Sequence, residues 1–322
     1  MAAIIFVHGI AQEQLSADLL EKDWVPGLAG GVRTAGFPAV ADRILRSSGS
    51  AQANRIEARM AYYGNLFRTH DQQGAGAGEI PADEILLAEA LAQVWLACAA
   101  EEEEATNAQD RRTARQKLAE LRDEPGLEKQ GLPGKVAASA IRSLSKLSWF
   151  APFGMGFAEK FVIRTLSQVT RYLCDETIRQ TAQRRVLELV GPETKVIIGH
   201  SLGSVVAYET VCALDWPRDQ SLPLLVTVGS PLGIRTIIYD RLRPQPPAFP
   251  RPVRRWINAA ARDDLVAAVP DLTPLFSAGL PEGAAFEGKW KVDNGSKPHD
   301  GLFYLGKESV GRPVGQVFAG AP

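Results

Sequence analysis

The sequence has few cysteines, almost no net charge and no long apolar run. Its 322 residues include three cysteines, Cys98, Cys174 and Cys212, which lie far apart and lack the spacing of a metal site. This pattern argues against a disulfide framework and is typical of a reducing compartment. The formal net charge is -1, so the charge balance does not favour nucleic acid as a partner.

The chain also lacks segments that would direct it into or across a membrane. No stretch approaches the ~18 consecutive apolar residues of a membrane-spanning helix. The first ten residues, MAAIIFVHGI, lack the basic start and the small-residue cleavage site of a secretory signal. We therefore expect these residues to form a first strand and the protein to be cytoplasmic.

Strand and helix patterns alternate near both ends of the chain. Apolar residues make up 45% of the sequence, which is ample for a core. We expect strands at residues 3–8, 55–63, 195–199, 222–228, 253–260 and 286–292, and helices at 15–45 and 202–214. Such alternation predicts an α/β fold, in which helices cover both faces of a mostly parallel sheet.

The middle of the chain shows helical spacing and no strand pattern. Apolar residues recur on one helical face at Leu87, Leu91 and Trp95, and on another at Val162 and Leu166. We therefore predict an α/β core formed by residues 1–65 and 186–322, and a helical insertion over residues 66–185. The glycine-rich segment at residues 71–81 is expected to be a flexible joint between them.

The segment KVIIGHSLGSVVAYE, residues 195–209, contains a G-x-S-x-G motif between a strand pattern and a helix pattern. A strand that passes directly into a helix needs a tight turn, and Gly199 and Gly203 would let neighbouring backbone pass close to it. Such a turn holds Ser201 out at the carboxyl edge of the sheet. We predict that Ser201 is a nucleophile; the alternative is a serine that only caps the helix.

A serine hydroxyl becomes nucleophilic when a base removes its proton, and the chain has four histidines. His299 follows the last expected strand in a loop of glycine, serine and proline, and we predict that it is the base. His200 is expected to pack beneath the turn. His8 should end the first strand, and His70 should lie on a surface loop.

The carboxylate that orients the base should follow a late strand and precede the histidine in the chain. Asp264 and Asp263 both lie just after the strand expected at 253–260, and we prefer Asp264. Asp271 lies further beyond that strand. Asp300 adjoins the predicted base itself, so both are weaker candidates.

Two backbone N–H groups are needed to stabilise the negative oxygen that forms during acyl transfer. Leu202, which follows the predicted nucleophile, would supply one. Ile10 would supply the other, because Gly9 keeps the backbone accessible after the first strand. An ordinary turn at the end of that strand is the alternative.

Five segments together resemble the α/β-hydrolase superfamily, specifically its lipase-like branch with an HG oxyanion loop. They are IIFVHGI, VIIGHSLGS, VTVGSPLG, WINAAARDDLVA and PHDGLFYLG, in the family's order of oxyanion loop, serine, aspartate and histidine. The resemblance implies hydrolysis of a carboxylic ester by Ser201, His299 and Asp264, with no metal or organic cofactor. An acyltransferase and a non-catalytic binding scaffold remain as alternatives.

In relatives of this family, an insertion at this place forms a helical cap, so we expect residues 66–185 to select the substrate. Their apolar run at residues 147–166 allows three interpretations: the core of the insertion, a pocket for an acyl chain, or contact with a membrane surface, for which the surrounding basic residues are suited. A lipid or long-chain ester is the preferred substrate, and a small-molecule ester is the alternative. The sequence does not indicate an oligomeric state.

Overall fold

The computed structural model describes residues 1–46, 54–68, 82–101, 107–123, 133–149, 155–217 and 219–320. The chain divides into two compact units, residues 1–66 with 179–322, and residues 67–178. Most of helix α7 (Glu176–Leu187) therefore belongs to the first unit, although we had assigned residues up to 185 to the insertion. The reason is tertiary: Arg179 on α7 forms a buried ion pair with Glu209 of the first unit.

The first unit contains a six-stranded sheet in which all neighbouring strands are parallel. The strands are β1 (Ile4–Val7), β2 (Ala58–Ala61), β3 (Val196–His200), β4 (Leu222–Val228), β5 (Val253–Ala261) and β6 (Ala285–Val292), in the order β2-β1-β3-β4-β5-β6. Each strand expected from the sequence is present, with small differences at its ends. The α/β class with a parallel sheet is confirmed.

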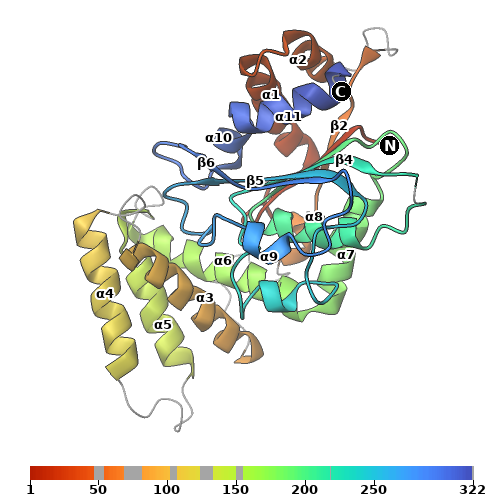
Figure 1. Ribbon diagram of the computed structural model, residues 1–322. Helices are drawn as coiled ribbons and strands as arrows, with labels where there is room; N and C mark the ends of the chain where they lie inside the picture. Colours follow the sequence, from red (N-terminus) through yellow and green to blue (C-terminus); the bar gives the residue numbers. More distant parts are fainter. Residues whose placement is uncertain are drawn as a thin grey trace. The chain divides into compact units, whose positions relative to one another are not determined.

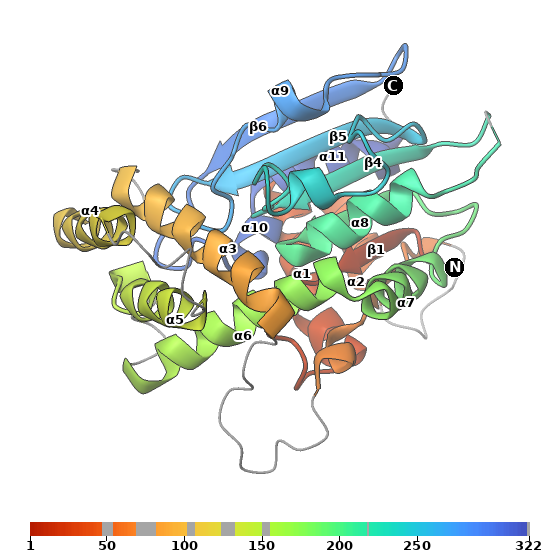
Figure 2. The same ribbon diagram turned by 90° about the horizontal axis from the view of Figure 1, so that it is seen from below.

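Helices cover both faces of this sheet (Figures 1 and 2). One face carries α1 (Ala17–Thr34), α2 (Pro38–Leu45), α10 (Gly301–Leu305) and α11 (Glu308–Ala319), and the other carries α7 and α8 (Leu202–Cys212). Short helical turns lie at Gly64–Phe67, Tyr239–Arg241 and Thr273–Phe276 (α9). The single helix expected at residues 15–45 is two helices, because Gly36 has a φ of 93° and Pro38 starts a new helix.

The central strands are mostly apolar because helices bury both of their faces. All four residues of β1 are buried, and so are the first four of β3. By contrast, β6 has a neighbour on one side only, and Lys289, Trp290 and Lys291 are exposed. The centre of the sheet is therefore buried, whereas part of β6 is exposed to solvent.

The first and last helices of the first unit pack very closely. Phe6 of β1 meets Trp24 of α1 edge to face, with ring centroids 5.6 Å apart. A Cβ atom on Gly31 would lie 2.2 Å from the Leu305 carbonyl oxygen, and one on Gly311 would lie 2.1 Å from the Gly31 carbonyl oxygen. Both positions require glycine, because the backbone of α1 touches the end of α10 at Gly31 and the start of α11 at Gly311.

The second unit is helical over its described residues, as the sequence predicts, and no strand occurs among them. It contains α3 (Ala82–Glu101), α4 (Ala108–Asp123), α5 (Pro133–Leu144) and α6 (Met155–Cys174). Helix α3 contacts each of the other three, and Leu91, Trp95 and Leu166 are buried. This unit therefore has an apolar core of its own.

Several expectations fall outside the described residues. They concern His70, the joint at 71–81, and much of the apolar run, namely residues 150–154 and the side chains of 155–158 and 161. The three interpretations of that run remain predictions. Within the ranges that the structure describes, no helix has both the length and the apolar content needed to cross a membrane.

Candidate active site

Ser201 lies at the sharp junction between β3, which ends at His200, and α8, which begins at Leu202. Its φ of 54° and ψ of -129° place a non-glycine residue in a sparsely populated backbone region. The Ser201 side chain makes no capping hydrogen bond to α8. The alternative in which this serine only caps the helix is therefore wrong.

The two glycines of the motif are required by close backbone contacts. A Cβ atom on Gly203 would lie 2.1 Å from the carbonyl oxygen of Val7 on β1. One on Gly199 would lie 2.6 Å from the carbonyl oxygen of Gly203. The predicted crowding at this turn is thus confirmed, and it explains how α8 can start so close to the sheet.

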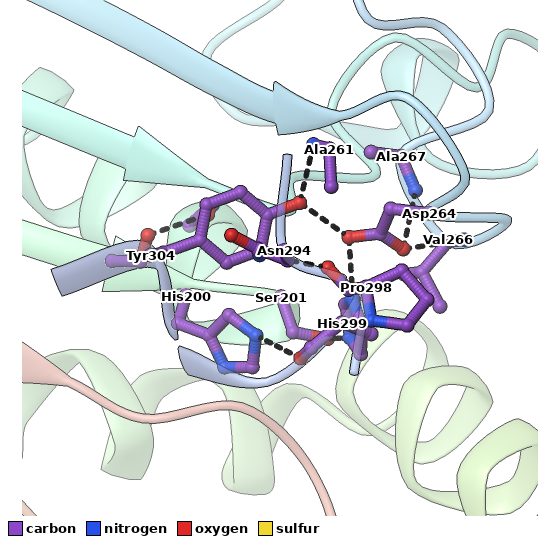
Figure 3. Close-up of polar contacts among 12 residues, drawn as sticks. His200, Ser201, Ala261, Asp264, Val266, Ala267, Asn294, Pro298, His299 and Tyr304 are labelled. Carbon is purple, nitrogen blue, oxygen red and sulfur yellow. Dashed lines mark hydrogen bonds and ion pairs between the residues drawn. The ribbon is translucent and has the colours of Figure 1, made fainter. Parts of the chain in front are cut away.

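Three of the predicted side chains form a continuous series of hydrogen bonds (Figure 3). Ser201 Oγ lies 2.9 Å from His299 Nε2, and His299 Nδ1 lies 2.8 Å from Asp264 Oδ2. Ser201 follows β3, Asp264 follows β5 and His299 follows β6. The three meet because the carboxyl ends of parallel strands lie along one edge of a sheet.

Asp264 is buried and held by four donors. Oδ2 accepts from His299 and from the Tyr304 hydroxyl at 2.7 Å, and Oδ1 accepts from the backbone N–H groups of Val266 and Ala267 at 3.0 and 3.4 Å (Figure 3). Burial alone would raise the pKa of this carboxyl group. The charge of His299 and the hydrogen bonds from His299 and Tyr304 outweigh burial and hold the pKa below its ordinary value.

The ionised carboxylate determines where the protons lie in the series. Since Asp264 can only accept, Nδ1 of His299 must carry the proton in that hydrogen bond. The other ring nitrogen, Nε2, is then free to accept from the Ser201 hydroxyl. Such an arrangement can remove the serine proton when its oxygen forms a new bond, and can stabilise the imidazolium that results.

His8 lies in the loop after β1 and is fully buried. Its Nε2 accepts from the backbone N–H of Tyr63 at 3.1 Å, so Nδ1 carries the proton and donates to the Gly9 carbonyl oxygen at 2.6 Å. Burial lowers the pKa of His8 to about 4, although its bond to Gly9 opposes this shift. A neutral His8 therefore fixes the backbone of the loop.

The predicted oxyanion donors belong to two segments that adjoin Ser201. A Cβ atom on Gly9 would lie 2.7 Å from Ser201 Cβ, so the loop that carries Ile10 packs directly against the serine. Leu202 is the first residue of α8, where the helix leaves an N–H group without an intrahelical acceptor. The start of a helix also favours negative charge. These features suit a carbonyl oxygen that becomes negative.

The weaker aspartate candidates have other contacts. Asp300 accepts from the N–H of Leu302 at the start of α10, and Asp271 accepts from the N–H of Thr273 at the start of α9. Asp264 rather than Asp263 provides the carboxylate that contacts His299. Sequence reasoning missed the contact of Tyr304 with Asp264, because nothing in the spacing of PHDGLFYLG sets a tyrosine apart.

Within the described ranges, no group of three histidine, cysteine, aspartate or glutamate residues is arranged to hold a metal ion. Comparison with protein-family models, curated proteins and solved structures gives no significant match to this chain. The chemistry of the site therefore has to be inferred from its own geometry.

Proposed function

We propose that this protein is a serine hydrolase of the α/β-hydrolase type that cleaves a carboxylic ester. The observation that carries the proposal is the unbroken series of hydrogen bonds from Ser201 through His299 to Asp264. The strained backbone of Ser201 adds support, because strain of this kind persists where a function requires it. A scaffold used only for binding has no need of these three groups in series.

The first half of the reaction acylates the enzyme. Ser201 Oγ attacks the ester carbonyl carbon, and its proton passes to His299 Nε2 as the C–O bond forms. The carbonyl electron pair moves to oxygen, where the N–H groups of Ile10 and Leu202 stabilise the charge. Asp264 stabilises the imidazolium. When the intermediate collapses, the C–O bond to the leaving alcohol breaks and His299 returns the proton to that oxygen.

The second half releases the acid. A water molecule attacks the acyl carbon while His299 Nε2 takes one of its protons. The tetrahedral intermediate then expels Ser201 Oγ, which recovers the proton from His299. One ester and one water give one alcohol and one carboxylic acid, and the three side chains return to their initial state.

We further propose that the helical insertion acts as a cap that selects a lipid or long-chain ester. The support is compositional, because the run at residues 147–166 is rich in aromatic and aliphatic residues. A series of p-nitrophenyl esters of increasing acyl length should show kcat/KM rising with chain length. A decline with length would assign the enzyme to small esters instead.

The catalytic proposal can be tested with a fluorophosphonate probe, which forms a bond to an activated serine. The parent protein should be labelled, whereas Ser201→Ala and His299→Ala should not, while both remain folded by circular dichroism. Ser277→Ala is the matched control, because the exposed Ser277 hydroxyl donates to the Thr273 carbonyl oxygen of α9. This variant should label like the parent. A folded parent protein that is not labelled would favour the binding scaffold.

A further inference from the structure

His200, the residue immediately before Ser201, contacts the backbone of the predicted base. Its Nε2 lies 2.8 Å from the carbonyl oxygen of His299 (Figure 3). Since a carbonyl oxygen can only accept, Nε2 of His200 carries a proton and donates it. The expectation that this ring simply packs beneath the turn was therefore incomplete.

Neighbouring groups enclose the His200 ring on several sides. The ring of His299 lies with its centroid 4.7 Å away, and Trp24 meets it edge to face at 6.0 Å. A Cβ atom on Gly301 would lie 3.3 Å from the ring, and one on Gly9 would lie 3.2 Å from Nδ1. With so little free space, the ring is held in the orientation that directs Nε2 at His299.

His200 is also fixed in its neutral form. Burial is the largest cause that lowers its pKa, to about 3, and the charge that His299 can carry acts in the same direction. His200 therefore keeps the same single proton through neutral pH. It adds no positive charge beside His299 that would oppose formation of an imidazolium there.

The loop that carries His299 is held at two consecutive carbonyl groups. Asn294 Nδ2 donates to the Pro298 carbonyl oxygen at 3.0 Å, and His200 Nε2 donates to the next one (Figure 3). Asn294 belongs to the loop itself, so its bond shapes the loop. His200 belongs to β3, so its bond joins the loop to the turn on which Ser201 lies.

From these contacts, and resting on the proposed function, we infer that His200 is a positioning residue for the acylation step. It holds the main chain of residue 299 where Nε2 of that residue reaches the Ser201 hydroxyl. His200 and Ser201 are consecutive in the turn between β3 and α8. If this turn shifts, Ser201 and the hydrogen bond from His200 to the His299 carbonyl shift together. The distance between nucleophile and base is thereby kept constant, although they come from distant parts of the chain.

The inference predicts a graded response to substitutions of His200. Leucine has a similar size but no donor, so His200→Leu should lower the labelling rate constant and kcat by about 10- to 100-fold, the loss expected from a misplacement of about 1 Å. The loss should appear in kcat much more than in KM, since the role inferred for His200 is to orient His299 and not to bind the substrate. Glutamine carries an amide N–H near the position of Nε2, so His200→Gln should recover most of the rate.

Ile44→Ala serves as the control for a loss of stability, because Ile44 of α2 is buried in the same apolar core as Trp24 and is not among the groups that enclose His200. It should lower thermal stability while the labelling rate stays near that of the parent. If His200→Leu does not fold, His200→Asn replaces it, since its shorter side chain cannot reach the His299 carbonyl. His200→Asn should then be slow and His200→Gln fast.

The possible outcomes separate this inference from the proposed function. A parent protein that is labelled, together with a folded His200→Leu that is labelled equally fast, would overturn the positioning role and leave the hydrolase intact. Equal impairment in the glutamine and leucine variants, or in the glutamine and asparagine variants, would also overturn it. A parent protein without labelling would remove the proposed function and this inference together.

Discussion

The hydroxyl oxygen of Tyr304 lies 2.7 Å from Asp264 Oδ2, the same carboxylate oxygen that contacts His299. The hydroxyl also accepts from the backbone N–H of Ala261, the last residue of β5, at 2.7 Å. Burial and the charge of Asp264 raise the pKa of this hydroxyl, so it remains protonated and donates. Tyr304 therefore ties the carboxylate to the end of the strand that precedes it.

Replacing Tyr304 with phenylalanine should weaken both the fold and the site. Asp264 would lose a donor and Ala261 an acceptor in a buried place, which should lower the free energy of unfolding by about 1–3 kcal/mol. If the lost hydrogen bond contributes about 1.4 kcal/mol to the stability of the transition state, the labelling rate should fall tenfold. Urea unfolding and fluorophosphonate labelling measure the two effects.

Tyr239→Phe is the matched control for this substitution, because the Tyr239 hydroxyl donates to the Leu275 carbonyl oxygen and contacts none of the three predicted catalytic residues. It should reduce stability and leave labelling unchanged. If Tyr304→Phe behaved in the same way, its hydroxyl would have a structural role only.

Gly203→Ala should prevent the turn from forming. Its Cβ atom would have to lie 2.1 Å from a backbone oxygen of β1, and backbone cannot move aside as a flexible side chain can. We expect a loss of about 3 kcal/mol or more, or no folded protein. Gly30 lies on the exposed face of α1, where an added Cβ atom would meet nothing within 4 Å beyond the nearby helix backbone. Gly30→Ala should instead stabilise the protein by about 1 kcal/mol. Equal stability of the two variants would contradict this explanation.

The free energy of unfolding should decrease as the pH falls below 6.5. In the folded protein the pKa of His8 is lowered from 6.5 to about 4, so below pH 6.5 the unfolded chain binds a proton that the folded chain does not. Stability should then fall by about 1.4 kcal/mol per pH unit until about pH 4. His200 should add a similar slope that continues to about pH 3. Asp264 follows the same rule, since its pKa is also lowered, but its contribution is lost only as the pH falls below its ordinary value of 3.8.

Urea unfolding at several pH values between 4 and 7 measures this dependence. His200→Gln should reduce the slope, because it removes one of the two groups that titrate in the unfolded chain alone. A free energy of unfolding that stays constant from pH 7 to pH 5 would show that His8 and His200 are not held neutral by the fold.

Helices α7 and α8 are joined by a buried ion pair. Arg179 Nε lies 2.9 Å from Glu209 Oε2, and Nη2 lies 2.5 Å from Oε1. Glu209 also accepts from Gln183 Nε2 and from the backbone N–H of Arg243, both at 2.9 Å. Every oxygen of this carboxylate is thus used.

Glu209→Gln should leave the Arg179 charge buried without its partner and lower the free energy of unfolding by about 3–5 kcal/mol. Asp42→Asn removes the partner of Arg33 in an exposed pair and should cost less than about 1 kcal/mol. Chemical denaturation compares the two. A similar small cost in both would show that water reaches the buried pair.

The local patterns of the sequence predicted most of the first unit. Apolar runs such as residues 222–228 are buried on both faces of the sheet and so are continuous in the sequence. Ser201, Asp264 and His299 were predictable because each follows the end of a parallel strand, and these ends meet at one edge. The ester hydrolysis inferred from them stays a prediction.

What the sequence did not reveal depends on contacts between distant segments. The choice between Asp263 and Asp264 is set by which of two consecutive side chains points towards His299, and periodicity cannot decide that after a strand has ended. The hydrogen bonds of Tyr304 and His200 join segments that are far apart in the chain, so the spacing of residues in the sequence does not predict them. The same holds for α7, whose helical pattern does not tell which unit it packs against.

The contact between Gly31 and Gly311 has a consequence for how the protein is made. Helix α1 buries its apolar side against α10 and α11, and most of the chain lies between them. While a ribosome is still producing the middle of the protein, α1 can pack against β1, β2 and α2, but the helices that cover the rest of its apolar side do not yet exist. The side of α1 that faces α10 and α11 therefore stays uncovered until synthesis has passed residue 311.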